Sequence, residues 1–269
     1  MMAPPTTTVR RHPSAGNLDS RPVLVAEDAA PEPLPPLSFP HGTELTGDLV
    51  QLGPDLDHEQ LAKLIGSVDG RRVLDLGCGT GAAAIALARR GARVIAVESS
   101  TSRLAQARAA AERAEVRIEF HHSDLADLAF LRADAVDLVV SVYSLAGVQD
   151  LSRVVRQVHR VLTPESPFLL SLPHPFATML EDDDTEQQPP TLTRTSWSST
   201  PIAWRAGADE GVAHPHSFGE LFTTLTRASF RVDTVLEPQA GTAGTSLHRS
   251  SLSEWVPETL VIRARKLGI

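Results

Sequence analysis

Three glycines in one short segment constrain the fold of this chain more than any other feature. Residues 73–81 read VLDLGCGTG, so Gly77, Gly79 and Gly81 stand directly after an apolar run and directly before an alanine-rich helical pattern. Glycine allows a positive φ, and because it has no Cβ the backbone can approach a ligand closely. The segment therefore predicts a strand that turns into a helix through a loop lying against a nucleoside.

The glycine spacing by itself leaves the kind of nucleoside open. Gly77, Gly79 and Ala82 also satisfy the G-x-G-x-x-G/A pattern of dinucleotide-binding loops. Glu98 ends the next predicted strand, where a carboxylate can accept hydrogen bonds from both hydroxyls of a ribose. Such an acid is expected in either kind of site, so a NAD-dependent oxidoreductase is an alternative at this point.

Short apolar runs alternate with helical patterns along most of the chain, as is typical of βαβ units around a parallel sheet. This alternation predicts an α/β fold: a Rossmann-like, doubly wound, mostly parallel seven-stranded sheet with helices on both faces. The expected strands cover residues 72–76, 93–97, 116–121, 135–142, 167–172, 230–236 and 258–264. The expected helices cover residues 55–68, 81–90, 102–114, 151–162 and 217–228.

Two segments depart from this alternation. Residues 1–40 hold nine of the 20 prolines and are expected to form a disordered tail, because such a segment buries too little apolar surface to offset its ordering entropy. The remainder, residues 41–269, is predicted to form one domain. Within it, residues 176–216 carry an acidic run together with Trp197 and Trp204. We interpret them as an irregular insertion over the mouth of the sheet, and a solvated acidic loop is the alternative.

Composition limits the partners and the compartment. The net charge of −8 and the pI near 5.7 disfavour a nucleic-acid substrate, which would require clustered Lys and Arg. The single cysteine, Cys78, excludes an intrachain disulfide and fits a reducing compartment. The chain contains no signal-peptide pattern and no apolar run of membrane-spanning length. A cytoplasmic protein without a membrane partner is expected, and the oligomeric state cannot be read from the sequence.

Four motifs together resemble the class I S-adenosylmethionine-dependent methyltransferases, and three C-terminal segments are similar to a subset that acts on small molecules: His214–Phe218, Ala228–Arg231 and Glu237–Pro238. VLDLGCGTG resembles that family's glycine motif, and the Ser123–Leu125 segment follows the third strand as its adenine-contacting acid does. The Asp137–Leu145 and His159–Pro164 segments are similar to its fourth-strand motif and the turn that follows its next helix. In place of family glycines the chain has Ser229 and the Glu165–Ser166 pair, while Glu98 stands where an Asp is commoner.

The resemblance implies S-adenosylmethionine as the cofactor and methyl transfer to an N, O or C atom of a small-molecule acceptor. By this resemblance Asp75 helps to hold the methionine end. The cofactor-binding residues implied are Asp75, Gly77, Cys78, Gly79, Gly81, Glu98, Ser99, Asp124, Leu125 and Ser141. A catalytically silent protein with this fold that acts as a binding subunit is a second alternative.

Candidate residues for the reaction itself follow the fourth and fifth strands. His174, between two prolines at the carboxyl end of the fifth strand, is predicted as a base or a substrate-orienting residue. Tyr143 is predicted to contact the substrate or to fill the core. Cys78 is interpreted as a small loop residue rather than a nucleophile, because no histidine adjoins it in the sequence. No metal is expected, although His214 and His216 have a spacing that permits one.

Overall fold

The computed structural model describes residues 50–53, 56, 58–181, 190–206, 209–239 and 254–268. The tail predicted for residues 1–40 lies outside these ranges. So do most of the acidic run in the insertion, residues 182–186, and the expected start of the first helix.

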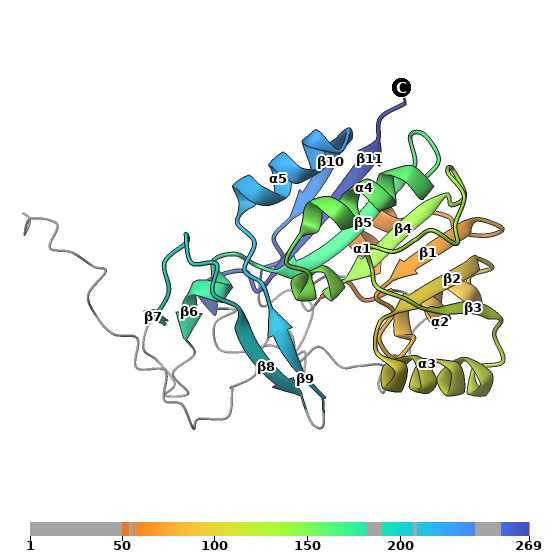
Figure 1. The fold of residues 1–269 in the computed structure, drawn as a ribbon, viewed down its shortest axis with the longest axis horizontal. Helices are drawn as coiled ribbons and strands as arrows, with labels where there is room; N and C mark the ends of the chain where they lie inside the picture. Colours follow the sequence, from red (N-terminus) through yellow and green to blue (C-terminus); the bar gives the residue numbers. More distant parts are fainter. Residues whose placement is uncertain are drawn as a thin grey trace, which may run out of the picture. The chain divides into compact units, whose positions relative to one another are not determined.

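A seven-stranded sheet organises the molecule (Figure 1). Its strands are β1 (Arg72–Leu76), β2 (Arg93–Glu98), β3 (Ile118–His122), β4 (Leu138–Val142), β5 (Pro167–Pro173), β10 (Phe230–Leu236) and β11 (Thr259–Lys266). The strand order is β10-β11-β5-β4-β1-β2-β3, and β11 runs antiparallel to both of its neighbours. The central strands are nearly continuous apolar runs because both faces of the sheet are covered. The predicted fold class is confirmed.

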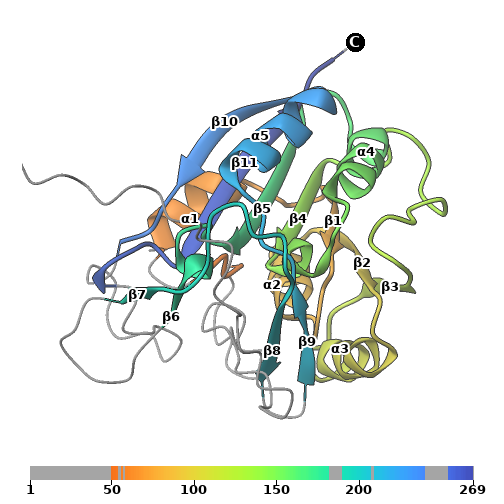
Figure 2. The same ribbon diagram turned by 60° about the vertical axis from the view of Figure 1, so that its left-hand side comes forward.

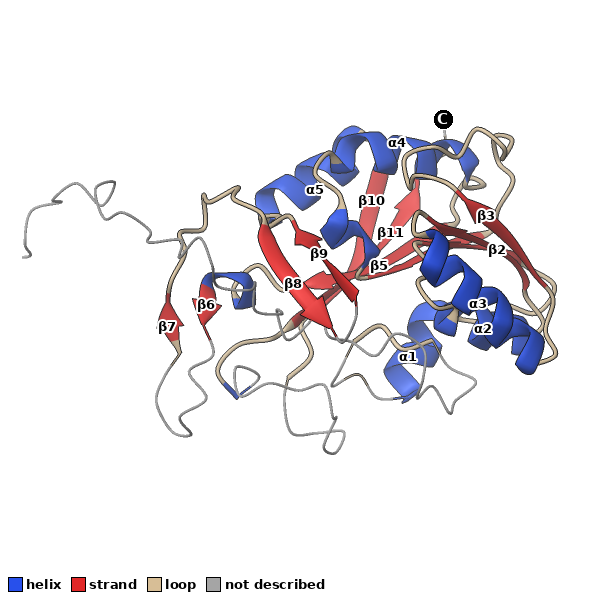
Figure 3. Ribbon diagram, turned by 60° about the horizontal axis from the view of Figure 1, so that its bottom comes forward, coloured by secondary structure: helices blue, strands red, loops and turns tan. Residues whose placement is uncertain are grey.

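In the described part of the chain, five α-helices cover the sheet, two on one face and three on the other (Figure 3). They are α1 (His58–Ile65), α2 (Ala82–Arg89), α3 (Thr101–Arg113), α4 (Leu151–Val161) and α5 (Phe218–Arg227). One apolar cluster joins α4 and α5 to the sheet, and a second joins α1, α2 and α3 to its other face. In the described parts of the chain, no helix is long and apolar enough to cross a bilayer.

The insertion is more regular than its sequence predicts. It contains a 3-10 helix, η4 (Ala177–Met179), and two antiparallel hairpins, which pair β6 (Leu180–Glu181) with β7 (Thr191–Leu192) and β8 (Ile202–Ala206) with β9 (Asp209–Ala213). The expectation of an irregular segment is therefore wrong for these residues. Figures 1 and 2 show the β8–β9 hairpin extending past the ends of β4 and β5.

One backbone hydrogen bond fastens this hairpin to the sheet. Directly after β9, the N–H of His214 donates to the carbonyl of Ala146 at 2.7 Å. Ala146 belongs to η3 (Ser144–Gly147), the 3-10 helix that follows β4. The insertion is therefore anchored at the sheet edge where open α/β folds bind their ligands.

Candidate functional site

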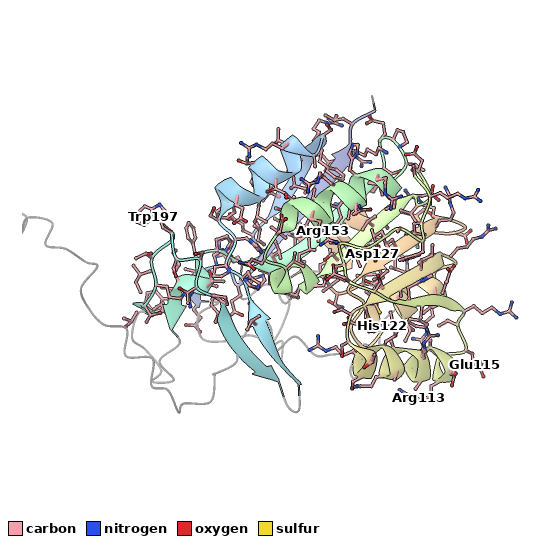
Figure 4. The ribbon with its side chains drawn as sticks, in the orientation of Figure 1. Arg113, Glu115, His122, Asp127, Arg153 and Trp197 are labelled. Atoms are coloured by element: carbon pink, nitrogen blue, oxygen red, sulfur yellow. The ribbon has the colours of Figure 1, made fainter. Side chains whose placement is uncertain are left out.

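A cavity of about 450 Å³ opens at this edge, within the roughly 300–1,000 Å³ range of small-molecule sites. Its walls come from the segments that follow β1, β2, β3 and β4 and from the first turn of α4. Figure 4 shows two side chains of this region, Arg153 on α4 and His122 at the end of β3. Eight of the ten predicted cofactor residues line the cavity together: Asp75, Gly77, Cys78, Gly79, Glu98, Ser99, Asp124 and Leu125.

The glycine loop is tight at two positions for different reasons. Gly77 has a φ of 79°, and a Cβ there would collide with the side chain of Ser144. Ser144 in turn donates its hydroxyl to the carbonyl of Leu76 at 2.5 Å, so the loop and η3 touch. Gly81 has a φ of 93° and lies against Ala107 of α3, where a Cβ would approach to 3.1 Å. Gly77 therefore lines the cavity, whereas Gly81 does not and instead packs α2 against α3.

Asp75 is the most unusual charged group in the cavity. Its side chain is 1% exposed, and no hydrogen-bond partner is found for Oδ2 among the described residues. Burial raises the pKa of Asp75 to about 7, the backbone N–H of Ala84 opposes this rise, and the charge of Glu98 adds to it. A buried carboxylate with an unused acceptor suits a cationic ligand group, such as the ammonium or sulfonium of S-adenosylmethionine.

Glu98 is held rigidly at the end of β2. Its Oε2 accepts the N–H of Gly79 at 2.9 Å, and its Oε1 accepts the N–H of Ser100 at 2.8 Å. A carboxylate oxygen has two lone pairs, so each oxygen can accept a second hydrogen bond. The two backbone donors fix the orientation of the carboxylate, and the remaining acceptors fit the two hydroxyls of a ribose.

The end of β3 supplies a polar and an apolar wall. Asp124 accepts the N–H of Ala126 at 2.8 Å through Oδ1, which orients the exposed carboxylate, and Leu125 follows it on the cavity wall. His122 bonds the carbonyl of Ser99 at 2.8 Å and so joins the loops after β2 and β3. An acceptor beside an apolar side chain suits the amino group and the ring of an adenine.

Tyr143 and Cys78 line the cavity, and the Tyr143 hydroxyl and the Cys78 thiol are both protonated at neutral pH. The Tyr143 hydroxyl bonds Oγ1 of Thr259, and burial raises the pKa of Tyr143. Burial also raises the pKa of the Cys78 thiol, and the charges of Asp75 and Glu98 add to that rise. A thiol in this state is a poor nucleophile, which agrees with the interpretation of Cys78 as a small loop residue.

Two further predicted residues do not line the cavity. Ser141 is fully buried and bonds Ser144 through the two hydroxyls at 2.6 Å, so it lies behind the wall that Ser144 forms. His174 is also fully buried, and both ring nitrogens are used. Its Nδ1 accepts the N–H of Phe176 at 3.1 Å, and its Nε2 donates to Oε1 of Glu237 at 2.9 Å. The bond between His174 and Glu237 therefore links the segment that follows β5 to the segment that follows β10.

Sequence reasoning missed several residues of the cavity wall. Position after a predicted strand could have indicated Ser144 and Gln149, which follow β4. Asp150 caps α4 by accepting the N–H groups of Ser152 and Arg153, and it also lines the cavity. The other missed residues include Gln51, Arg103, Arg153 and Val212, which come from separate parts of the chain.

Across the described ranges, no group of three or more His, Cys, Asp or Glu side chains is arranged to hold a metal ion. His216 bonds the carbonyl of Val148 through Nε2 at 2.9 Å, and its Nδ1 lies 3.3 Å from Oε1 of Glu220. His214 shares none of these partners. The spacing of the two histidines is thus accounted for without a shared ion.

Comparison with known proteins identifies relatives for this arrangement. Residues 73–165 match the model of a methyltransferase domain. The ubiquinone biosynthesis O-methyltransferase of Alkalilimnicola ehrlichii is 32% identical over 113 residues, which cover 42% of this chain and 46% of that protein. The chain thus matches about half the length of this curated relative.

Solved structures extend the likeness over most of the described fold. An S-adenosylmethionine-dependent methyltransferase from Mesorhizobium loti has a TM-score of 0.64 at 27% identity, covering 80% of this chain and all of that one. A methyltransferase structure from Listeria monocytogenes has a TM-score of 0.65 at 21% identity, covering 78% and 96%, and supports the fold alone. The domain match includes the glycine loop, and the fold over about four fifths of the chain is that of S-adenosylmethionine-dependent methyltransferases, so the comparisons support a class I S-adenosylmethionine-dependent methyltransferase.

Proposed function

We propose that this protein transfers the methyl group of S-adenosylmethionine to a small-molecule acceptor. The observation that carries the proposal is the cavity itself, in which a buried carboxylate with a free acceptor, Asp75, faces the same space as the oriented carboxylate of Glu98. The two alternatives, a NAD-dependent oxidoreductase and a silent binding protein, find no support in the domain match or the relatives.

The cofactor, when bound, supplies an electrophilic methyl group. The protein therefore has to align the cofactor with the acceptor and enclose them both, and it does not have to activate the methyl group. Asp75 would pair with the positive charge at the methionine end, and Glu98 would accept the ribose hydroxyls. Asp124 and Leu125 would contact the adenine. Tyr143, held by Thr259, would form a fixed wall near the reacting groups. His174 has a positioning role in this scheme, because its ring nitrogens are occupied.

Three observations bear on the acceptor. The β9 residue Val212 lines the cavity, which supports the proposal that residues 176–216 help to select the acceptor. The net charge of −8 supports a small metabolite over a nucleic acid, and the single cysteine supports a cytoplasmic, reducing compartment. The curated relative from Alkalilimnicola is named an O-methyltransferase, so oxygen is the first acceptor atom to test.

Isothermal titration with S-adenosylmethionine, S-adenosylhomocysteine and NAD, each titrated separately, tests the proposal. Saturable binding of the first two and none of NAD is expected. Binding of NAD alone would contradict the proposal, and so would the absence of binding by all three. Release of S-adenosylhomocysteine in the presence of a panel of hydroxylated small molecules then tests for turnover.

A further inference from the structure

Methylation of a hydroxyl requires a group that accepts its proton, and the main cavity offers few. The Cys78 thiol and the Tyr143 hydroxyl have raised pKa values and are protonated at neutral pH. The pKa of Asp150 is lowered by hydrogen bonds from Ser152, so it is a weak base. Asp75, Glu98 and Asp124 belong to the part of the cavity proposed for the cofactor. The proton acceptor is therefore to be sought beside the cavity.

A second, smaller hollow lies directly beside it. This hollow, of about 10 Å³, is large enough for about one water molecule or a single polar group of a ligand. It shares Ala146 with the main cavity, so one methyl side chain forms part of the wall of both. Its remaining walls come from the end of β5, from η4 and from the β8–β9 hairpin, and they are largely apolar.

His214 lines this hollow and is free to react. Its ring has no hydrogen-bond or ion-pair partner among the described residues, whereas its backbone N–H is bonded to Ala146. The histidines near it differ, since His174 and His216 both bond other groups through their rings. The backbone of His214 is thus held in place, while no described residue occupies its ring nitrogens.

The charge state of His214 suits a proton acceptor. Burial lowers its pKa, and the neighbouring His216 lowers it further, so the imidazole is neutral at pH 7. The other titratable groups close to this hollow are Glu220, which pairs with His216, and His174 after β5. A neutral imidazole beside an apolar space is the usual general base for an acidic hydroxyl.

We propose that His214 is the catalytic residue that receives the proton of a phenolic hydroxyl acceptor, which reaches the small hollow from the main cavity. This inference rests on the methyl-transfer function proposed above. The hydroxyl proton passes to an imidazole nitrogen, and the oxygen lone pair forms the new bond to the methyl carbon. The carbon–sulfur bond breaks with its electron pair staying on sulfur, and the imidazolium returns its proton to water.

Two acceptors of different acidity test this role. The probes are 3,4-dihydroxybenzoate, whose phenolic hydroxyls are protonated at neutral pH, and 4-nitrocatechol, which ionises near neutral pH without help. Replacing the base with His214→Gln should lower kcat for the first probe by roughly 100-fold or more, the usual contribution of a general base. The loss for 4-nitrocatechol should be much smaller. The Kd for S-adenosylhomocysteine and the melting temperature should not change.

A pH profile and a chemical rescue separate this role from a structural one. In the wild type, kcat/KM for 3,4-dihydroxybenzoate should fall as the pH drops through the lowered pKa of His214, because the protonated ring cannot accept a proton. His214→Gln should lack this limb, and added imidazole should restore part of the activity of His214→Ala. His121→Gln, which changes a partly exposed histidine outside both cavities, is the matched control and should behave as the wild type.

Each remaining outcome has a distinct meaning. Equal losses for the two probes in His214→Gln, or no loss for either, would overturn the assignment of His214. Wild-type protein that binds S-adenosylhomocysteine but methylates neither probe would also overturn it, because the phenolic acceptor would be wrong. Wild-type protein that does not bind S-adenosylhomocysteine would instead contradict the methyl-transfer function on which the inference rests.

Discussion

At the scale of single residues, Glu98 joins the cofactor loop to the end of β2. Its two oxygens accept backbone N–H groups on both sides, and the same oxygens are the acceptors proposed for the ribose. A hydrogen bond to a charged acceptor contributes about 1.5–3 kcal/mol. Glu98 also fixes the glycine loop through its bond to Gly79. Its replacement is therefore expected to lower the affinity for the cofactor by more than the loss of one charge would.

We expect Glu98→Ala to weaken S-adenosylhomocysteine binding by roughly tenfold or more, because at least one charge-assisted bond is lost. Titration calorimetry measures the effect, and Glu98→Gln, which keeps one oxygen acceptor, should give an intermediate Kd. Glu119→Ala on β3 is the control, because Glu119 is exposed and lies outside the cavity. A Kd in Glu98→Ala equal to that of the wild type would remove Glu98 from the ribose site.

Asp75 should make cofactor binding depend on pH. In the free protein its pKa is about 7, and a bound cation would lower it, so binding below pH 7 includes the release of a proton. Affinity for S-adenosylmethionine should therefore rise between pH 6 and 8, flattening at the upper end, as measured by titration calorimetry. Asp75→Asn should bind more weakly and lose this dependence, and a wild-type Kd that does not vary with pH would contradict the assignment.

The same shift predicts an effect on the stability of the free protein. The folded pKa of Asp75 lies above its unfolded value of 3.8, so folding favours the protonated form. Its stabilising contribution is complete below pH 3.8 and is lost as the pH rises through about 7. The free energy of unfolding of Asp75→Asn, measured in urea, should exceed that of the wild type at pH 8, and the difference should shrink toward pH 5.

At the scale of elements, the end of α5 is strained. Ser229, directly before β10, has a φ of 59°, a left-handed conformation that is unfavourable for residues with a Cβ. Glu165, before β5, has a φ of 61° in the same way. The resemblance described in the sequence analysis implies glycine at both turns, and here Ser229 and Glu165 adopt the left-handed conformation that glycine would adopt without strain.

Ser229→Gly should relieve this strain and stabilise the protein by about 0.5–1 kcal/mol, after the larger unfolded-state entropy of glycine is taken into account. Urea denaturation measures the change. Ser229→Ala keeps the Cβ and is the matched control, and we expect it to give no gain. Equal stability of the two variants would show that the left-handed turn is not strained.

At the scale of the whole molecule, one buried lysine ties together parts that are far apart in the sequence. Nζ of Lys266, on the last strand, donates to Oδ1 of Asp134 at 2.7 Å and to the carbonyl of Leu162 at 2.8 Å. Asp134 precedes β4 and Leu162 caps the end of α4. The lysine side chain is only 10% exposed and its bond to Leu162 is buried, whereas the Asp134 side chain is 51% exposed.

Lys266→Ala should lower the free energy of unfolding by roughly 1–3 kcal/mol, because a buried carbonyl loses its donor and a charge-assisted bond is lost. Chemical denaturation checks this value. Lys63→Ala removes an ion pair with Glu59 in which both side chains are more than 70% exposed, and it should cost about 0.5 kcal/mol or less. Equal effects of the two substitutions would argue against a linking role for Lys266.

Local patterns in the sequence were sufficient to predict the class of fold and the part of the site proposed for the cofactor. The alternation of apolar runs and helices predicted all seven strands of the main sheet, because strand and helix periodicity are local properties. Most of the residues expected around the cofactor line the cavity. They lie at the carboxyl ends of β1, β2 and β3 or directly after them. The carboxyl ends of parallel strands lie at one edge of the sheet. A residue that directly follows such a strand is therefore predicted to lie at that edge.

The tertiary structure alone determined the part of the site that is proposed for the acceptor. Tyr143 bonds Thr259 across 116 positions of the sequence, and His174 bonds Glu237 across 63, so neither partner could be read from local spacing. Val212 lines the cavity because a hairpin of the insertion is anchored on η3 by His214. Such contacts depend on how separate elements pack and on which hydrogen-bond partners packing brings within reach. The sequence by itself therefore determined the cofactor edge of the sheet, and packing determined the wall proposed for the acceptor.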